Sequence, residues 1–429
     1  MTFTSCIWIA AVILGLLAQS PLHAGMTPEE VQAFTWHKSD AEKGVADAQY
    51  KLGLCYSEGL GVAKDPVQAI LWWRKAAEQG DAMSQFKIGN SYYSGEGVAK
   101  NLAQAATWFH KAADSRIKGF RLKTPRTWSP TPGLAAAQFS LGNCYFNGEG
   151  VSKDLVQAVF WYRKAAEQGH AVAQNKLGVS YVKGEGVAKD DVQAAFWYRK
   201  AAEQGHAIAQ SNLGARYYYG EGVTKDYMQA VSWYRKAAEQ GVAEAQYNLG
   251  ICYYDGLGVT LDHMQAASLF RKAAEQGFVY AQYNLGVCYD DGEGVAKDAV
   301  QAVSWYRKAA EQGFANAQNE LGDSYYNGDG LTKDYVQAVA WFRKAAVQGF
   351  AEAHYNLGTC HKDGHGVAKD EVEAYAHWSL AGTTNEEARE NLPVLEKKMS
   401  PDQIAAGKRR TKELQKEIEA KVAAKTAGK

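Results

Sequence analysis

A Leu-Gly or Ile-Gly pair returns along the chain at a constant interval, and this repetition limits the possible folds more than any other feature. The glycine of the pair stands at positions 53, 89, 142, 178, 214, 250, 286, 322 and 358. Successive glycines are 36 residues apart except after Gly89, where the interval is 53, so nine copies of one unit carry a single insertion of 17 residues. A period of roughly 20 to 50 residues is typical of repeat architectures, in which stacked units bury a shared core.

Each copy carries the pattern of two helices. In the copy at residues 281–313, Ala281, Leu285 and Tyr289 follow the i, i+4, i+8 spacing that places side chains on one helix face. A second apolar stripe begins at Ala302. Glycines follow both stripes, and glycine is favoured just after a helix because it adopts the left-handed conformation readily. The unit is therefore predicted to be a helix-turn-helix.

The start of the second helix is marked by an acidic or amide residue in every copy. Asp and Asn are preferred N-caps because a side-chain oxygen accepts a hydrogen bond from a free backbone N–H, which contributes about 1 kcal/mol. The predicted caps are Asp65, Asn101, Asp154, Asp190, Asp226, Asp262, Asp298, Asp334 and Asp370.

Three further positions recur and are interpreted as core. The glycine of the Leu-Gly pair lies inside the first helix, where its lack of a Cβ would let a neighbouring helix approach closely. Five cysteines share one position two residues later and are predicted to be buried and unpaired, since equivalent positions of stacked units lie too far apart for a disulfide. A tryptophan register on the second helix is predicted to be core and not a ligand-stacking surface: Trp36, Trp72, Trp108, Trp161, Trp197, Trp233, Trp305 and Trp341.

The recurring motif is A-x-x-x-L-G-x-x-Y-x-x-G-x-G-V-x-x-D, followed by A-x-x-W-Y/F-x-K-A-A-x-x-G. It resembles the Sel-one-like repeat family, a branch of the tetratricopeptide-like helical repeats. The resemblance implies an all-α fold: an α-solenoid superhelix of nine 36-residue helix-turn-helix repeats, with an N-terminal half-repeat and a C-terminal helical cap.

The expected division of the chain follows from the repeat limits. Residues 1–24 contain the uncharged run 7–18 and are predicted to be a signal peptide, so the protein is expected to be periplasmic or secreted, with no membrane span in the mature chain. Residues 25–44 are the expected capping half-repeat, 45–382 the solenoid, and 383–429 a basic helical tail. The insertion at about 115–133 is basic, and is either a partner-contacting loop or a tolerated surface insertion.

The composition and motifs argue against several functions. Lys and Arg together number 47, equal to Asp and Glu, and such a balanced chain is not expected to bind nucleic acid. Neither a phosphate-binding loop nor a catalytic triad pattern occurs, so no cofactor and no catalytic residue is predicted and the protein is not expected to be an enzyme. Ser115–Lys118 matches S-x-x-K of serine β-lactamases without the companion motifs and is interpreted as chance.

Histidines and acidic residues crowd the last copy, where metal ligands could be drawn from six residues. Gly364 and Gly366 place one of them, His365, in the turn and away from the helix face of His361. No metal site is therefore predicted, and zinc binding lost in His361→Ala would reverse that prediction. The six residues are His354, Cys360, His361, Asp363, His365 and His377.

The solvent-facing stripe of the first helices is the predicted partner-binding surface, because the resemblance implies that these helices line a concave face. The charge of the stripe changes along the chain, from net positive in the first five copies to net negative in the last four. Such a gradient would orient an extended peptide; the alternative is a solvated face with drifting charges. The predicted binding residues are Lys51, Lys87, Lys176, Lys183, Asp255, Asp291, Glu320, Asp323 and Asp363.

These observations favour a non-enzymatic protein-interaction scaffold or adaptor, a monomer that binds an extended segment of a protein or peptide partner. The alternative is an exported cell-wall-directed hydrolase or β-lactam-binding repeat protein, an activity that the resemblance associates with some members of the family.

Overall fold

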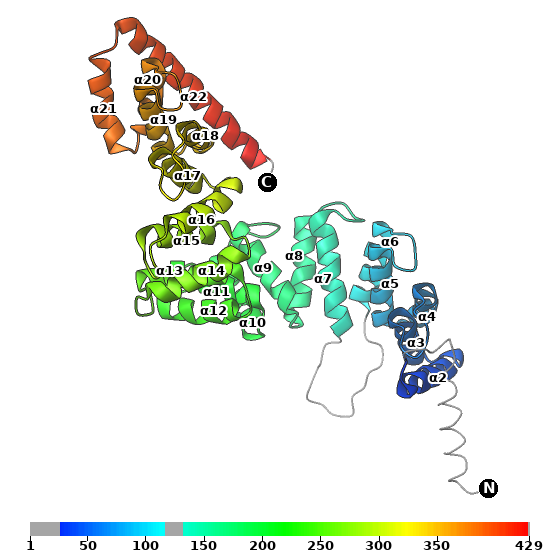
Figure 1. Cartoon of the computed structure of the whole chain (residues 1–429). Coiled ribbons are helices and arrows are strands. Elements are labelled where there is room, and N and C mark those ends of the chain that lie inside the picture. The colour runs from blue at the N-terminus through cyan, green and yellow to red at the C-terminus, as the bar shows by residue number, and fades with distance from the viewer. Residues whose placement is uncertain (1–25, 116–131, 428–429) are drawn as a thin grey trace, which may run out of the picture. The chain divides into compact units, whose positions relative to one another are not determined.

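The computed structural model describes residues 26–115 and 132–427, and these fold entirely into helices and connecting turns, without a β-strand (Figure 1). The predicted signal peptide and nearly all of the predicted insertion lie outside the described residues. The all-α fold and the presence of two helices in each repeat are confirmed. The chain divides into two compact units, Met1–Lys225 and Asp226–Lys429, so that the fifth repeat contributes its first helix to one unit and its second helix to the other.

The helices alternate along the chain in the order that the repeat predicts. The first helices of the nine repeats are α3 (Ala46–Glu58), α5 (Ala82–Ser94), α7 (Pro132–Asn147), α9 (Ala171–Lys183), α11 (Ala207–Tyr219), α13 (Ala243–Asp255), α15 (Val279–Asp291), α17 (Ala315–Asn327) and α19 (Ala351–Asp363). The second helices are α4 (Pro66–Glu78), α6 (Leu102–Asp114), α8 (Leu155–Glu167), α10 (Asp191–Glu203), α12 (Tyr227–Glu239), α14 (His263–Glu275), α16 (Ala299–Glu311), α18 (Tyr335–Ala346) and α20 (Glu371–Ala381).

All nine predicted N-caps are confirmed at the second helices. At α16, for example, a side-chain oxygen of Asp298 accepts hydrogen bonds from the backbone N–H groups of Val300 and Gln301, each 3.0 Å long. The first helices end on glycines in the left-handed conformation, such as Gly292 with φ of 78°. Local sequence therefore sets where the first helix of each repeat ends and where the second begins.

The glycine of the Leu-Gly pair lies where an aromatic ring of the second helix packs against the first. A Cβ on Gly286 would stand 2.5 Å from Cε1 of Tyr306, and one on Gly358 would stand 2.3 Å from Cδ1 of Trp378. Both rings are buried. The predicted steric role of this glycine is confirmed, and its partner is the aromatic residue twenty positions further along the chain.

The tryptophan register, predicted as core, is mostly half-buried, and that prediction is wrong for most copies. Trp161 is buried, whereas Trp36 is 63% exposed and the others lie between these limits. The ring that fills the core is one residue later, as Tyr162 shows. Five of these tryptophans pack at the junction with the preceding helices, namely Trp72, Trp108, Trp161, Trp305 and Trp341. Most of the register also holds a lysine three residues later over the ring, as Lys344 does at 3.4 Å from the Trp341 ring centre.

Hydrogen bonds between side chains join consecutive repeats. An arginine of the second helix donates to the tyrosine hydroxyl of the next first helix, in the pairs Arg74–Tyr92, Arg163–Tyr181, Arg199–Tyr217, Arg235–Tyr253, Arg271–Tyr289 and Arg307–Tyr325. In every repeat but the last, a glutamine of the first helix also donates to a carbonyl of the helix that precedes it, as Gln318 Nε2 does to Ala310 O at 3.1 Å. These bonds repeat with the period of the chain.

The ends of the array are covered by helices outside the full repeats. α2 (Pro28–Glu42), the predicted half-repeat, begins with a capping box between Thr27 and Glu30 and packs on α3. At the other end, α21 (Glu386–Glu396) and α22 (Pro401–Ala427) pack on α20. Leu395 and Met399 join Trp378 in a buried cluster there. The last repeat therefore has its own cover.

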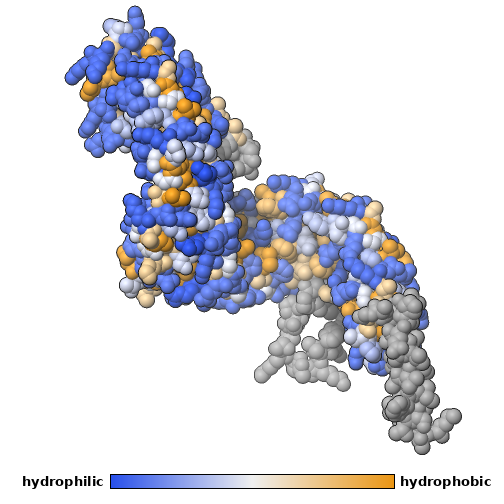
Figure 2. All heavy atoms as spheres, viewed as in Figure 1, coloured by the Kyte–Doolittle hydropathy of each residue, from blue (hydrophilic) through white to orange (hydrophobic). Residues whose placement is uncertain are grey.

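The cysteines agree with the sequence analysis. The five cysteines of the repeat, the ones described by the structure, are free and buried: Cys55, Cys144, Cys252, Cys288 and Cys360. On the face shown in Figure 2, hydrophobic residues are scattered among hydrophilic ones. Across residues 26–115 and 132–427, no helix is both long enough and apolar enough to cross a bilayer.

Candidate functional site

The predicted binding residues lie on the first helices with partly or fully exposed side chains. Lys51, Lys176, Lys183, Asp255, Asp291 and Asp363 are exposed, whereas Lys87, Glu320 and Asp323 are half-buried. Two lysines have acidic neighbours of their own: Lys51 Nζ is 2.8 Å from Asp47 and Lys183 Nζ is 3.9 Å from Glu185. Counting only the stripe therefore overstates the positive charge near these two lysines.

Two of the predicted acidic residues meet in a cavity. Glu320 and Asp323 of α17, Asp290 of α15 and Tyr306 of α16 line the same cavity of about 260 Å³. Asp255, Asp291 and Asp363 are not part of its lining. Asp290 was missed because it lies one position before the predicted stripe residue Asp291. The cavity is a concentration of negative charge between consecutive repeats within one unit.

Burial and mutual repulsion raise the pKa values of these carboxyls above their usual range. Burial, and then the nearby Glu320 carboxylate, raise the pKa of Asp323 to about 7. Asp323 is nevertheless held as an acceptor, because the side-chain amides of Asn319 and Asn356 donate to it at 2.9 Å and 3.0 Å. Burial also raises the pKa of Glu320 and of Asp290, with neighbouring carboxylates adding to the effect. A cation in the cavity would relieve this cost.

We expect Asp323→Asn to stabilise the protein at pH 8 by about 2 kcal/mol. The folded protein holds the Asp323 proton more tightly than the unfolded chain, whose pKa is near 3.8. The resulting destabilisation is absent below about pH 4, grows up to about pH 7, and is complete above that. Urea denaturation of both proteins at pH 4.5 and pH 8 measures it.

The matched control is Asp255→Asn, which removes an exposed carboxylate of the same stripe. It should change the free energy of unfolding by less than about 0.5 kcal/mol at either pH. An advantage of Asp323→Asn that is equal at both pH values would contradict the assignment.

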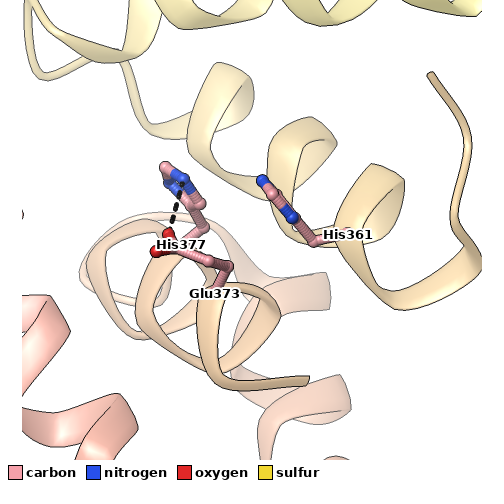
Figure 3. A group of neighbouring side chains, drawn as sticks. All are labelled: His361, Glu373 and His377. Atoms are coloured by element: carbon pink, nitrogen blue, oxygen red, sulfur yellow. Dashed lines mark ion pairs between the residues drawn. The ribbon is translucent and has the colours of Figure 1, made fainter. Parts of the chain in front are cut away.

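The histidines of the last repeat divide into two groups. His361 of α19 lies near His377 and Glu373 of α20 (Figure 3). His354 of α19 also contacts His377, with their Nδ1 atoms 2.9 Å apart. His365 lies apart, since it contacts the Tyr326 hydroxyl at 2.8 Å and stacks on Tyr335. Glu373 was missed although it stands four residues before His377 on a predicted helix, which places both on one face.

The S-x-x-K match carries no catalytic arrangement that the structure describes. Ser115 Oγ lies 2.8 Å from both Gln85 Oε1 and the backbone carbonyl of Lys111, so the hydroxyl is bound within the scaffold. Lys118 lies outside the described residues.

A family model and two solved structures all relate this chain to repeat proteins of one type. A family model described as the Sel1 repeat matches residues 46–81, 82–116, 135–170, 171–206, 207–242, 243–278, 279–314, 315–350 and 351–383. The chain is similar to c5321, a protective antigen present in uropathogenic Escherichia coli strains and displaying an SLR fold, with 34% identity, 98% of this chain and 94% of that chain covered, and a TM-score of 0.64. It is similar to a Sel1 repeat protein from Oxalobacter formigenes, with 33% identity, 74% and 87% coverage, and a TM-score of 0.55. No curated protein matches the chain.

Proposed function

The chain belongs to the Sel1 repeat family, a scaffold fold suited to protein interactions, and we propose that it is a non-enzymatic adaptor that binds an extended segment of a partner protein along its first helices. The partner segment lies on the concave face of the stacked helices and carries basic residues towards the copies rich in carboxylates. The protein acts as a monomer in the exported space.

The observation that carries this proposal is the cavity formed by Asp290, Glu320 and Asp323. Carboxylates partly withdrawn from water are unfavourable unless a cation lies near them, and of the three only Asp290 has a lysine, Lys297, among the charges that act on its pKa. A lysine or arginine side chain of a partner supplies that charge, and a cavity of about 260 Å³ has room for it. Neighbouring repeats offer further polar side chains along the stripe, which suits an extended segment better than a compact ligand.

The charge gradient supplies the orientation. Lys87 and Lys176 lie 5.9 Å from the ring centres of Trp73 and Phe146, and among residues 26–115 and 132–427 no carboxylate forms an ion pair with either lysine. They remain available to acidic groups of a partner. Complementary charge of this kind raises the association rate and selects the orientation of the bound segment.

The test is affinity capture from the envelope of the native cells at low and high salt, followed by measurement of affinity for the captured protein. We expect Lys51→Glu with Lys87→Glu to weaken binding about tenfold, and binding to fall as salt screens the charges. The charge-matched control is Lys100→Glu with Lys153→Glu, which alters two exposed lysines in the turns before second helices.

Equal affinity in the stripe variant and in the control would remove the oriented-groove proposal. The intact mass of the protein from the same fraction checks export, because cleavage of the predicted signal would leave Gly25 as the first residue. Size-exclusion chromatography with light scattering measures the molar mass in solution and so tests whether the protein is a monomer. Nitrocefin turnover above buffer background would instead favour the hydrolase class.

A further inference from the structure

The last repeat departs from the others at four positions that meet in space. His354 stands where the eight preceding copies carry glutamine, His361 where they carry tyrosine, and Glu373 where they carry glutamine. His377 stands where seven of the eight carry tryptophan. Each change introduces a residue type that binds metal ions.

These replacements give up interactions that the other repeats keep. Tyrosine at the position of His361 accepts a hydrogen bond from the preceding arginine in six repeats, and Arg343 has a histidine there instead. Tryptophan at the position of His377 carries a lysine over its ring in most copies. The loss of both contacts in one repeat calls for a compensating role.

The geometry brings three ligand atoms together. One atom each of His361, Glu373 and His377 lies within 4.8 Å of the other two. Glu373 and His377 are one turn apart on α20, with Oε2 and Nε2 3.8 Å apart, and His361 faces them from α19 (Figure 3). Tetrahedral zinc with bonds of about 2.0–2.1 Å holds its ligand atoms about 3.3 Å apart, so small side-chain rotations close the site.

Surrounding groups hold the ligands in place. Arg410 Nε of α22 donates to Glu373 Oε1 at 2.8 Å, which leaves Oε2 facing His377. The Nδ1 atoms of His354 and His377 are 2.9 Å apart, so one donates to the other and the ring of His377 is fixed with Nε2 towards Glu373. Outer contacts of this type orient metal-binding histidines and carboxylates.

One ring nitrogen of a candidate ligand residue is left without a partner. Nδ1 of His361 is buried and forms no hydrogen bond with any residue that the structure describes. A buried polar atom of this kind is unfavourable unless something binds it.

The cavity favours neutral imidazoles. Burial lowers the pKa of His361, and lowers the pKa of His377 further, with His354 and His361 as the next causes. Neutral imidazole is the form that binds metal. Arg343 and Arg410 bring positive charge to the same cavity, and Glu373 and Glu417 bring negative charge. The cavity of about 370 Å³ has room for a water molecule beside the ion.

We propose that His361, Glu373 and His377 bind one zinc ion, with water as the fourth ligand and His354 and Arg410 as positioning residues. Two imidazoles and one carboxylate are a ligand set that zinc accepts, and three protein ligands leave one position open. The site belongs to the last repeat alone, because the preceding copies carry other residues at these positions. It is independent of the proposed peptide-binding stripe.

The test uses the full chain without a histidine tag, stripped of metal with a chelator and titrated with Zn²⁺ by calorimetry. We expect one ion per chain with micromolar or tighter affinity, and a rise in Tm on adding Zn²⁺. His361→Tyr, Glu373→Gln and His377→Trp each install the residue that other repeats carry. Each should weaken binding at least tenfold while circular dichroism shows the helical fold retained.

The matched control is His263→Gln. This variant removes a histidine outside the last repeat whose Nδ1 lies 3.4 Å from the Glu293 carboxylate. It should leave stoichiometry and affinity unchanged. Co²⁺ in place of Zn²⁺ should give a visible absorption band in the wild-type chain that disappears in His361→Tyr. The proposal is overturned if the stripped chain binds no Zn²⁺, or if all three folded variants bind it as tightly as the wild-type chain.

Discussion

Replacing Gly322 by valine is expected to destabilise the protein by about 3 kcal/mol or more. A Cβ at this position would stand 2.5 Å from Cε1 of Phe342, whose side chain is fully buried. Valine adds two methyl groups beyond that Cβ. Alanine would gain about 1 kcal/mol in helix propensity relative to glycine, but the clash exceeds this gain because the enclosed ring cannot move aside. Urea denaturation followed by circular dichroism measures the effect.

The control variant Gly313→Ala measures the cost of the backbone conformation alone, without a steric clash of the added side chain. Gly313 has φ of 88° and nothing within 4 Å of the added Cβ, so the strain of the left-handed conformation is the whole effect there. That strain costs about 1 kcal/mol. If Gly322→Val destabilised the chain no more than Gly313→Ala, close packing of the ring on the first helix would not be what the glycine provides.

The second large effect concerns the C-terminal cover. A chain ending at Ser400 lacks α22 and is expected to lose about 2–5 kcal/mol in the stability of the last repeat, because burial of Leu414 contributes about 1.5–3 kcal/mol and the half-buried Ile404 about half of that. Removal of Arg410 with α22 would also leave Glu373 without its ion pair to that residue. Hydrogen exchange of α20 and light scattering on heating measure the loss and the resulting aggregation.

A chain ending at Glu419 is the control, since residues 420–424 are exposed and the contacts of Leu414 are kept. It should exchange and melt like the full chain. Similar protection of α20 in both truncated chains would show that the last repeat is stable without its cover.

The helical hairpin was predictable because its determinants are local. The cap residues and terminal glycines act within a few positions, so Asp298 and Gly292 reveal the ends of their helices without knowledge of the tertiary fold. The sequence pattern assigned the buried aromatic ring of the second helix to the tryptophan register, whereas the buried ring belongs to the next residue along the chain. Trp305 and Tyr306 are adjacent and both fit an apolar stripe, and only the position of Gly286 on the facing helix decides which ring is buried.

The candidate sites depended on contacts that periodicity does not specify. The stripe of the first helices follows from helix geometry, but the meeting of Asp290 with Glu320 depends on how one repeat sits on the next. The same holds for His361 and His377, on different helices. Comparing the last copy with the others, position by position, would have indicated Glu373, since it is the acidic exception at a glutamine position.

A repeat array leaves the register of the proposed partner segment undefined, because the segment could shift by one repeat and meet the same backbone. The acidic cavity would define that register. The copies before and after offer only uncharged residues where Glu320 and Asp323 stand, namely Asn284, Val287, Asn356 and Thr359. In the proposed complex, a segment shifted by one repeat would bring its cation to neutral side chains, so the cavity would select one register of the segment along the repeated helices.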